Sequence, residues 1–101
     1  MDKKFFYEKK VHIFKALANP VRLEILDFLS SGEKCVCEIV QELGYEQPHI
    51  SKSLQKLKDA GLIAQRKEGL NVYYSLQFNC MGDFLTCLNT VLVHTLPAKK
   101  E

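Results

Sequence analysis

Two cysteines, Cys35 and Cys37, stand on either side of a single valine in the segment SGEKCVCEIVQELG. Thiolates are the ligands that soft metals and metalloids prefer, so a close pair can bind such an ion. The same pair can be converted to a disulfide or a persulfide. Redox pairs are more often spaced C-x-x-C, so the chemistry of this C-V-C pair depends on the elements that position it.

The length of 101 residues, with 47% apolar residues, predicts one domain spanning residues 1–101. The chain has no run of eighteen apolar residues, and its start, MDKKFFYEKK, lacks the apolar stretch of a secretion signal. We therefore expect a cytoplasmic protein that makes no contact with a membrane. In that compartment four cysteines indicate free thiols, metal ligands or redox sensors rather than structural disulfides.

The C-V-C pair lies at the predicted start of a short helix. Cys35 takes the place that serine or threonine has in a capping box, with Glu38 three residues later and Gly44 at the helix end. A second amphipathic helix begins at Gln47 and closes at Gly61. Two such helices joined by a tight glycine turn predict a helix-turn-helix.

The flanking segments complete a winged helix-turn-helix. Helical spacing predicts one helix over residues 5–17, and a second begins after Asn19 at Pro20. Alternating residues 62–67 and 71–76 predict a hairpin, the wing. The last helix, residues 79–95, carries an apolar stripe that predicts a dimer face paired with the first helix. The expected fold is mainly α with a small β-hairpin, in the order ααααββα, and a homodimer through the first and last helices.

Positive charge is concentrated in the middle of the chain. Residues 47–67 contain five lysines or arginines and one aspartate, a balance of +4, which leaves −2 for the remainder of the +2 chain. A basic cluster within a nearly neutral chain is typical of a nucleic-acid-binding protein. The expected partner is double-stranded DNA.

The second helix of a winged helix-turn-helix enters the major groove. Gln47, His49 and Ser51 are the expected base-reading residues, because amide and hydroxyl groups can pair with base edges. Lysines of the same helix are expected to hold phosphates. The full set of candidate DNA contacts is Gln47, His49, Ser51, Lys52, Gln55 and Lys56 on the helix, with Arg66, Lys67 and Asn71 in the wing.

Four segments in this order carry a resemblance to a known family: ALANPVRLEIL, E-x-C-V-C-E, QPHISKSLQKLKDAGLI and RKEGLNVYYSL. The chain resembles the ArsR/SmtB family of metal-responsive repressors of bacteria and archaea. The resemblance implies a homodimeric repressor that binds an inverted-repeat operator and leaves it when an effector binds. It also implies that the effector ligands are Cys35 and Cys37, the thiols of the E-x-C-V-C segment.

The chain departs from the arsenic-responsive pattern at the third thiol, where it has Val40. A three-sulfur site would need Cys80 or Cys87, and we expect Cys80, because Cys87 lies on the apolar stripe and is expected to be buried. Three thiolates favour As(III) or Sb(III), whereas other thiophilic ions such as Cd(II) or Pb(II) remain alternatives. Residues i and i+2 do not share a helical face, so the first helical turn is expected to loosen when both sulfurs bind one ion. No organic cofactor is implied.

Three other functions are weighed against this one. The same DNA-binding repressor could instead respond to disulfide or persulfide formation, either at Cys35 with Cys37 or at Cys80 with Cys87. An enzyme is not expected, because the chain lacks C-x-x-C, a phosphate-binding glycine loop and a nucleophile–base arrangement at recognisable spacing. A winged helix that contacts only proteins does not fit the basic face of residues 47–67.

Overall fold

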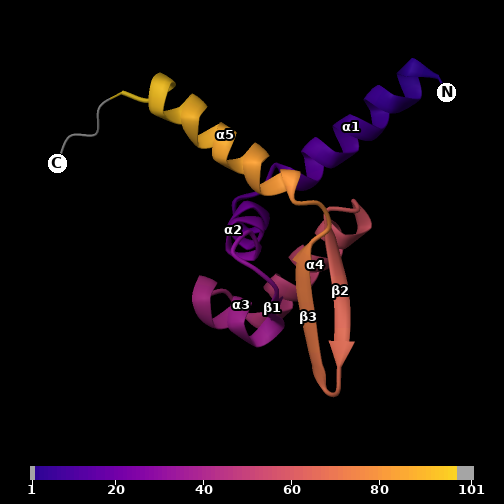
Figure 1. Ribbon diagram of the computed structural model, residues 1–101, viewed down its shortest axis with the longest axis vertical. Helices are drawn as coiled ribbons and strands as arrows, with labels where there is room; N and C mark the ends of the chain where they lie inside the picture. The colour runs from indigo at the N-terminus through magenta and orange to yellow at the C-terminus, as the bar shows by residue number, and fades with distance from the viewer. Residues whose placement is uncertain (1, 98–101) are drawn as a thin grey trace.

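The computed structural model describes residues 2–97, which form five helices and three short strands (Figure 1). The elements, in chain order, are α1 (Lys3–Leu17), α2 (Pro20–Leu29), β1 (Lys34–Cys35), α3 (Val36–Leu43), α4 (Gln47–Asp59), β2 (Ile63–Glu68), β3 (Asn71–Leu76) and α5 (Cys80–Thr95). The prediction of a mainly helical winged helix-turn-helix is confirmed, with one strand more than expected.

Local sequence signals set the helix boundaries. The side chain of Asn19 accepts a hydrogen bond from the Arg22 backbone N–H at 3.2 Å, and Pro20 occupies the first position of α2. Gly44 ends α3 in the left-handed conformation, with φ of 78°, a conformation that costs other residues energy. This turn brings the chain directly into α4, the predicted recognition helix.

The core lies where α2, α3 and α4 meet the base of the hairpin. In α4, Ile50, Leu54 and Leu57 are fully buried at the predicted i, i+4, i+7 spacing, so the opposite face of this helix is left for solvent. The buried apolar cluster comprises Leu17, Val21, Ile25, Leu26, Leu29, Ile39, Ile50, Leu54, Leu57, Leu62, Ile63 and Leu85.

The sheet has three strands in the order β1-β3-β2, all antiparallel. Strands β2 and β3 form the predicted wing, with Ile63 opposite Leu76 at its base. Strand β1, in which Cys35 lies opposite Tyr73, was not predicted from the sequence. A strand of two residues has no alternation that a sequence pattern can reveal, and only the return of β3 supplies its partner.

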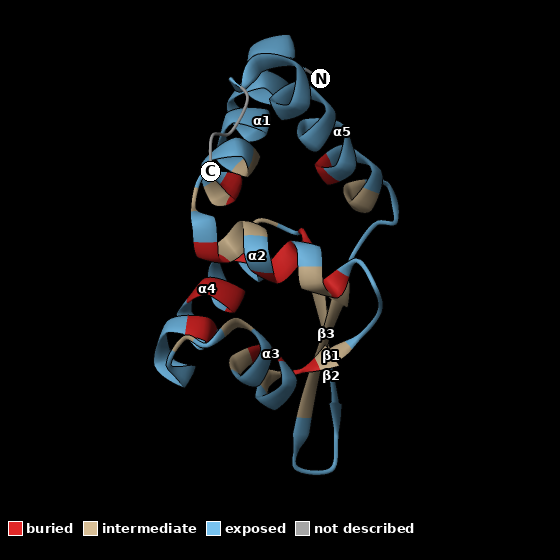
Figure 2. Ribbon diagram, turned by 90° about the vertical axis from the view of Figure 1, so that its left-hand side faces the viewer, coloured by how far each residue is buried: buried red, intermediate tan, exposed pale blue. Residues whose placement is uncertain are grey.

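Helices α1 and α5 project from the core as two diverging arms (Figure 1). The radius of gyration is 15.3 Å, compared with about 13 Å for a compact domain of this length. Both arms are exposed along most of their surface (Figure 2). Their exposed large apolar residues are Phe5, Phe6, Tyr7, Val11 and Phe14 in α1, and Phe84, Leu88, Val91, Leu92 and Val93 in α5.

The expected burial of Cys87 is wrong for the single chain, in which Cys87 is exposed. The reason is that Leu85 is the one buried residue of α5, and Cys87 lies beyond the start of the helix, where Met81 packs against the core. Within residues 2–97, no helix has the length and apolar character needed to cross a membrane.

Candidate effector site and nucleic-acid interface

Cys35 is the point at which the wing sheet and the helix-turn-helix join. Its backbone is extended, with φ of −80° and ψ of 161°, and it serves both as the last residue of β1 and as the N-cap of α3. Its side chain is 8% exposed, whereas Cys37 in the first turn of α3 is exposed. One thiol is therefore fixed in the fold, and the other faces solvent.

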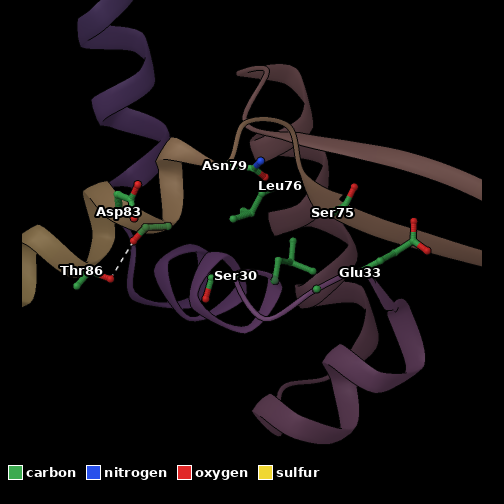
Figure 3. Close-up of a pocket in the computed structure, with 10 residues that line it drawn as sticks. Ser30, Glu33, Ser75, Leu76, Asn79, Asp83 and Thr86 are labelled. Atoms are coloured by element: carbon green, nitrogen blue, oxygen red, sulfur yellow. Dashed lines mark hydrogen bonds between the residues drawn. The ribbon is translucent and has the colours of Figure 1, made fainter.

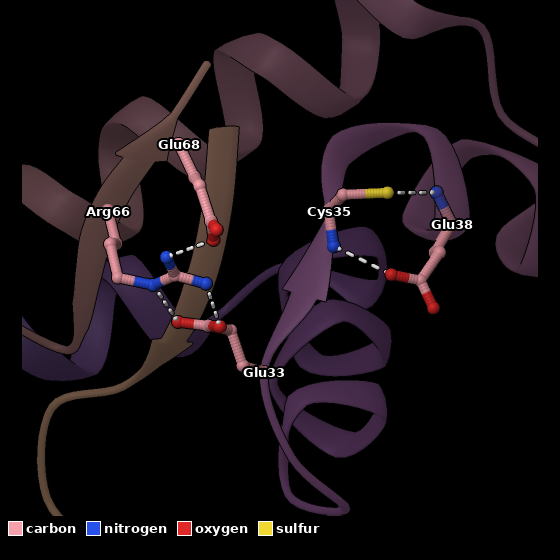
Figure 4. Close-up of polar contacts among 5 residues, drawn as sticks. All are labelled: Glu33, Cys35, Glu38, Arg66 and Glu68. Carbon is pink, nitrogen blue, oxygen red and sulfur yellow. Dashed lines mark hydrogen bonds and ion pairs between the residues drawn. The ribbon is translucent and has the colours of Figure 1, made fainter. Parts of the chain in front are cut away.

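A capping box holds the start of α3, as predicted (Figure 4). The Cys35 sulfur accepts a hydrogen bond from the Glu38 backbone N–H at 3.4 Å, and the Cys35 backbone N–H donates to the Glu38 carboxylate at 3.0 Å. An N–H donor at a helix N-terminus also stabilises negative charge on sulfur, the form of cysteine that binds thiophilic ions.

The two sulfurs of the C-V-C pair lie together and are joined as a disulfide, with the two Cα atoms 5.4 Å apart. The expectation that the first helical turn must loosen before both sulfurs meet is wrong. Cys35 lies outside the helix in extended conformation, so the helical angle that separates residues i and i+2 does not apply to the pair. The sulfurs can therefore chelate one atom while α3 remains intact.

The predicted wing contact Arg66 is surrounded by carboxylates (Figure 4). Its guanidinium donates to Glu33 at 2.7 and 3.1 Å and to Glu68 at 2.6 Å, and it lies 4.7 Å from the centre of the Tyr73 ring. The hydrogen bond from Arg66 lowers the pKa of Glu33, and both carboxylates raise the pKa of Arg66. Arg66 thus ties the wing to the segment that precedes the cysteine pair.

The predicted face of the recognition helix is open to solvent. All six candidate residues of α4 are exposed, although the Gln55 amide donates to Asp59 at 2.8 Å and is partly committed within the helix. In the wing, Lys67 and Asn71 are also exposed. Of the nine candidate DNA contacts, Arg66 is the one whose charge is already balanced by ion pairs with Glu33 and Glu68.

Tyr45 fixes the start of the recognition helix. Its hydroxyl donates to the Glu24 carboxylate of α2 at 2.5 Å, and its ring contacts His49 edge-on, with the ring centres 5.3 Å apart. The hydrogen bond to Glu24 raises the pKa of Tyr45. These contacts restrain the imidazole of His49, a candidate base-reading residue.

A groove of about 240 Å³ joins the cysteine pair to two of the candidate DNA contacts. It is lined by the two cysteines and Val36, by Gln47 at the start of α4, and by Leu70, Asn71 and Val72 of the wing. The structure thus brings four of the predicted site residues to one place: Cys35, Cys37, Gln47 and Asn71. In this groove a ligand bound by sulfur would lie beside candidate DNA contacts.

Cys80 is not near the other thiols in a single chain. It lies exposed at the start of α5, and among residues 2–97 no three His, Cys, Asp or Glu side chains are close enough to hold a metal ion. The described part of one chain therefore provides two sulfur ligands that lie together. A third ligand from Cys80 stays a prediction that requires another subunit.

A larger cavity of about 470 Å³ lies between α2, β3 and the start of α5 (Figure 3). Its wall contains the acidic side chains of Glu33 and Asp83, together with Ser30, Asn79 and Thr86. The Glu33 carboxylate already binds Arg66, and the Thr86 hydroxyl donates to the backbone oxygen of Gly82 at 3.0 Å. None of the predicted site residues lines this cavity.

Comparison with known proteins identifies the family. A profile described as "Bacterial regulatory protein, arsR family" matches residues 19–65. An HTH-type transcriptional regulator of Methanocaldococcus jannaschii is 51% identical over 70 residues, 67% of this chain and 79% of that protein. The arsenical resistance operon repressor of Staphylococcus aureus is 35% identical over 85 residues, 84% of this chain and 82% of that protein. The chain belongs to the ArsR family of transcriptional regulators.

A solved structure supports the same assignment. The homodimeric winged helix-turn-helix DNA-binding domain Mb0332 of Mycobacterium bovis superposes with a TM-score of 0.86 at 31% identity, over 100% of this chain and 94% of that one. ArsR-family proteins are DNA-binding regulators, which agrees with the expectation that the chain is not an enzyme.

Sequence reasoning missed the residues that connect the two parts of this ArsR-family site. Glu33 pairs with Arg66 over a separation of 33 residues, which no local pattern indicates. Glu68 could have been found, because residues i and i+2 of a strand lie on the same face, where opposite charges attract. Leu70 and Val72 were assigned only to the hairpin, although together with Val36 they form the apolar part of the groove.

Neutralising Glu33 tests how far the carboxylates suppress the charge of Arg66. In Glu33→Gln, the guanidinium loses one of its two carboxylate partners and becomes more available to a phosphate, so DNA affinity should fall more steeply with salt, by up to about 0.9 in the log–log slope. Fluorescence anisotropy titrations between low and moderate salt measure this slope. The control, Glu8→Gln, makes the same charge change on the exposed surface of α1. Equal slopes for the two variants would contradict the prediction.

Proposed function

We propose that this ArsR-family chain is a dimeric repressor that binds an inverted-repeat operator and is released when a thiophilic metal or metalloid binds Cys35 and Cys37. As(III) and Sb(III) are the proposed effectors, with Cd(II) and Pb(II) as alternatives. The observation that carries the proposal is the position of Cys35, which belongs to the sheet of the wing and caps the helix-turn-helix.

The proposed DNA contacts follow from the exposed face of α4. Gln47, His49 and Ser51 lie in its first turns, where a recognition helix meets base edges. Lys52 and Lys56 follow on the solvent side, and Lys67 and Asn71 extend the basic surface into the wing. Phosphate contacts by the lysines would supply affinity, and contacts to base edges would supply sequence preference.

The proposed coupling runs through the backbone of Cys35. Effector binding is proposed to shift Cys35. This residue is connected to the sheet by its pairing with Tyr73 and to α3 by the capping box with Glu38. A shift at this position therefore changes the angle between the wing and α4. Both must meet the same DNA duplex, so a small change of angle lowers affinity for DNA.

Dimer formation is supported by the uncovered apolar residues of α1 and α5. Phe14 of α1 and Phe84 of α5 contact each other edge-on where the two helices leave the core, with ring centres 6.3 Å apart, and both rings are exposed. A monomer rarely exposes an apolar patch of this kind, so a second copy of the chain is the proposed cover. The related Mycobacterium bovis domain is described as homodimeric.

The dimer can be tested with one charge on α5. Leu88→Glu places a carboxylate on the exposed apolar surface and should convert the protein to a monomer, because burying an unpaired charge is costly. Sedimentation velocity measures the mass in solution. The control, Thr90→Glu, adds the same charge about 200° around the helix and should leave the dimer intact. A wild-type monomer would contradict the proposal.

The phosphate contacts can be tested by the salt dependence of DNA binding. Lys52→Ala and Lys56→Ala should each weaken binding to every sequence and reduce the log–log salt slope by about 0.9, because one counterion fewer is released. Anisotropy with a duplex selected from a random library measures affinity and slope. Lys4→Ala, with the same charge change on α1, should leave the slope unchanged. An unchanged slope for Lys52→Ala and Lys56→Ala would remove them from the interface.

The effector site can be tested with single cysteine variants. Cys37→Ser should bind DNA normally but fail to dissociate with arsenite under reducing conditions, because one of the two adjacent ligands is lost. Cys87→Ser is the matched control and should respond as the wild type. The response of Cys80→Ser decides whether a third sulfur is recruited. Full release of the Cys37→Ser variant by arsenite would show that the effector binds elsewhere.

Oxidation of the same pair is the second candidate signal, and the disulfide between Cys35 and Cys37 favours it. The mild oxidant diamide, added without metal, distinguishes the two candidates. If diamide releases the DNA and arsenite under phosphine reductant does not, the chain is a redox sensor. If only arsenite releases the DNA, the chain is a metalloid sensor.

A further inference from the structure

We infer that the groove beside Cys35 and Cys37 takes the organic substituent of a trivalent arsenical, R–As(OH)₂, whose arsenic is bound by the two sulfurs. This inference rests on the proposed effector site and names the class of ligand that the site prefers. The preferred inducer is then an alkyl or aryl arsenical rather than inorganic arsenite.

The number of adjacent sulfurs favours an organic arsenical over arsenite. Trivalent arsenic makes three covalent bonds, and in arsenite all three are to oxygen. Two thiolates leave one As–OH bond of arsenite unreplaced, and the described residues of one chain bring no third thiol to Cys35 and Cys37. In R–As(OH)₂ one bond is already to carbon, so the same two sulfurs replace every hydroxyl group.

The apolar lining of the groove also favours a carbon substituent on the arsenic. Val36, Leu70 and Val72 provide apolar side chains next to the sulfurs, and the wing-tip residue Leu70 is fully exposed in the free protein. The groove measures about 240 Å³, whereas an apolar cavity of about 150 Å³ holds a benzene ring. A methyl or phenyl substituent therefore fits beside the arsenic and shields Leu70 from water.

The binding step is a substitution in which arsenic stays trivalent. The two thiols form two S–As bonds and two As–OH bonds break, and each leaving hydroxide takes a thiol proton to form water. The pair must first be reduced from the disulfide: a phosphine supplies the two electrons and becomes the phosphine oxide, and water supplies its oxygen and the two thiol protons. No other co-reactant is needed.

The position of the substituent also explains release from DNA. Gln47 and Asn71 form the polar part of the same groove, and both are candidate DNA contacts from different elements, α4 and the wing. A substituent that fills the groove lies between them and obstructs their approach to the duplex. A carbon substituent is thus expected to release DNA more effectively than a hydroxyl group at the same position.

The test compares phenylarsonous acid with arsenite on protein reduced by a phosphine in a buffer free of dithiols. Intact-protein mass spectrometry counts the adducts, and anisotropy measures DNA release. Phenylarsonous acid should act at about tenfold lower concentration than arsenite, because the phenyl ring buries apolar surface. Cys37→Ser should abolish both the adduct and the release.

The apolar lining is tested by the double variant Leu70→Ala, Val72→Ala. The advantage of phenylarsonous acid over arsenite should fall to about threefold or less in adduct formation, which is measured without DNA. Leu96→Ala, an exposed leucine outside the groove, should keep the full advantage.

Three results would overturn the inference. Equal response to the two arsenicals, or an undiminished advantage in the double variant, would show that the groove does not hold the substituent. Weaker phenylarsonous acid binding in Cys80→Ser would show that a third sulfur is used. In each of these cases arsenite-induced release would leave the proposed function standing, whereas no adduct with either arsenical would reject both.

Discussion

The connection between the wing and the helix-turn-helix depends on the backbone of Cys35, whose conformation must suit both a strand and a helix N-cap. Its extended conformation completes the short strand that pairs with Tyr73, and the same conformation is the one an N-cap requires. Its sulfur replaces the usual hydroxyl as acceptor for the Glu38 backbone N–H. The wing and the helix-turn-helix are therefore not independent modules, because a single residue belongs to both.

This arrangement places the two cysteine sulfurs close to residues that are candidate DNA contacts. Cys35 is nearly buried and Cys37 is exposed, so one sulfur is enclosed by the fold while the other is accessible to an incoming reagent. The groove between them and the wing also contains Gln47, the first residue of the recognition helix. Any ligand held by the pair, whether an ion, an organic arsenical or a sulfur adduct, occupies space beside that helix.

The cationic side chains of residues 47–67 differ in whether neighbouring carboxylates balance their charge. Lys52, Lys56 and Lys67 are exposed on the predicted DNA face, whereas Arg66 is held by Glu33 and Glu68. The two carboxylates give Arg66 a structural task, which is to hold the wing against the segment leading to Cys35. Such an ion pair is partly exposed, so its value lies in geometry more than in stability.

Helices α3 and α4, the hairpin and the position of the C-V-C pair at a helix start could all be predicted from the amino-acid sequence. These features are local: the capping box needs only Cys35 and Glu38, the turn needs Gly44, and the core stripe of α4 repeats every third or fourth residue. The exposure of the candidate DNA contacts in α4 was also predictable, because the side of an amphipathic helix opposite its core stripe must face solvent.

The neighbours of the cysteine pair, by contrast, could not be predicted, because they come from distant parts of the chain. The pairing of β1 with β3, the contact of Glu33 with Arg66 and the groove shared with Leu70 and Val72 join residues more than thirty positions apart. The meeting of the two sulfurs depended on Cys35 lying outside the helix, whereas helical geometry had predicted their separation. Contacts of this kind arise from how elements pack, and no periodicity in the chain encodes them.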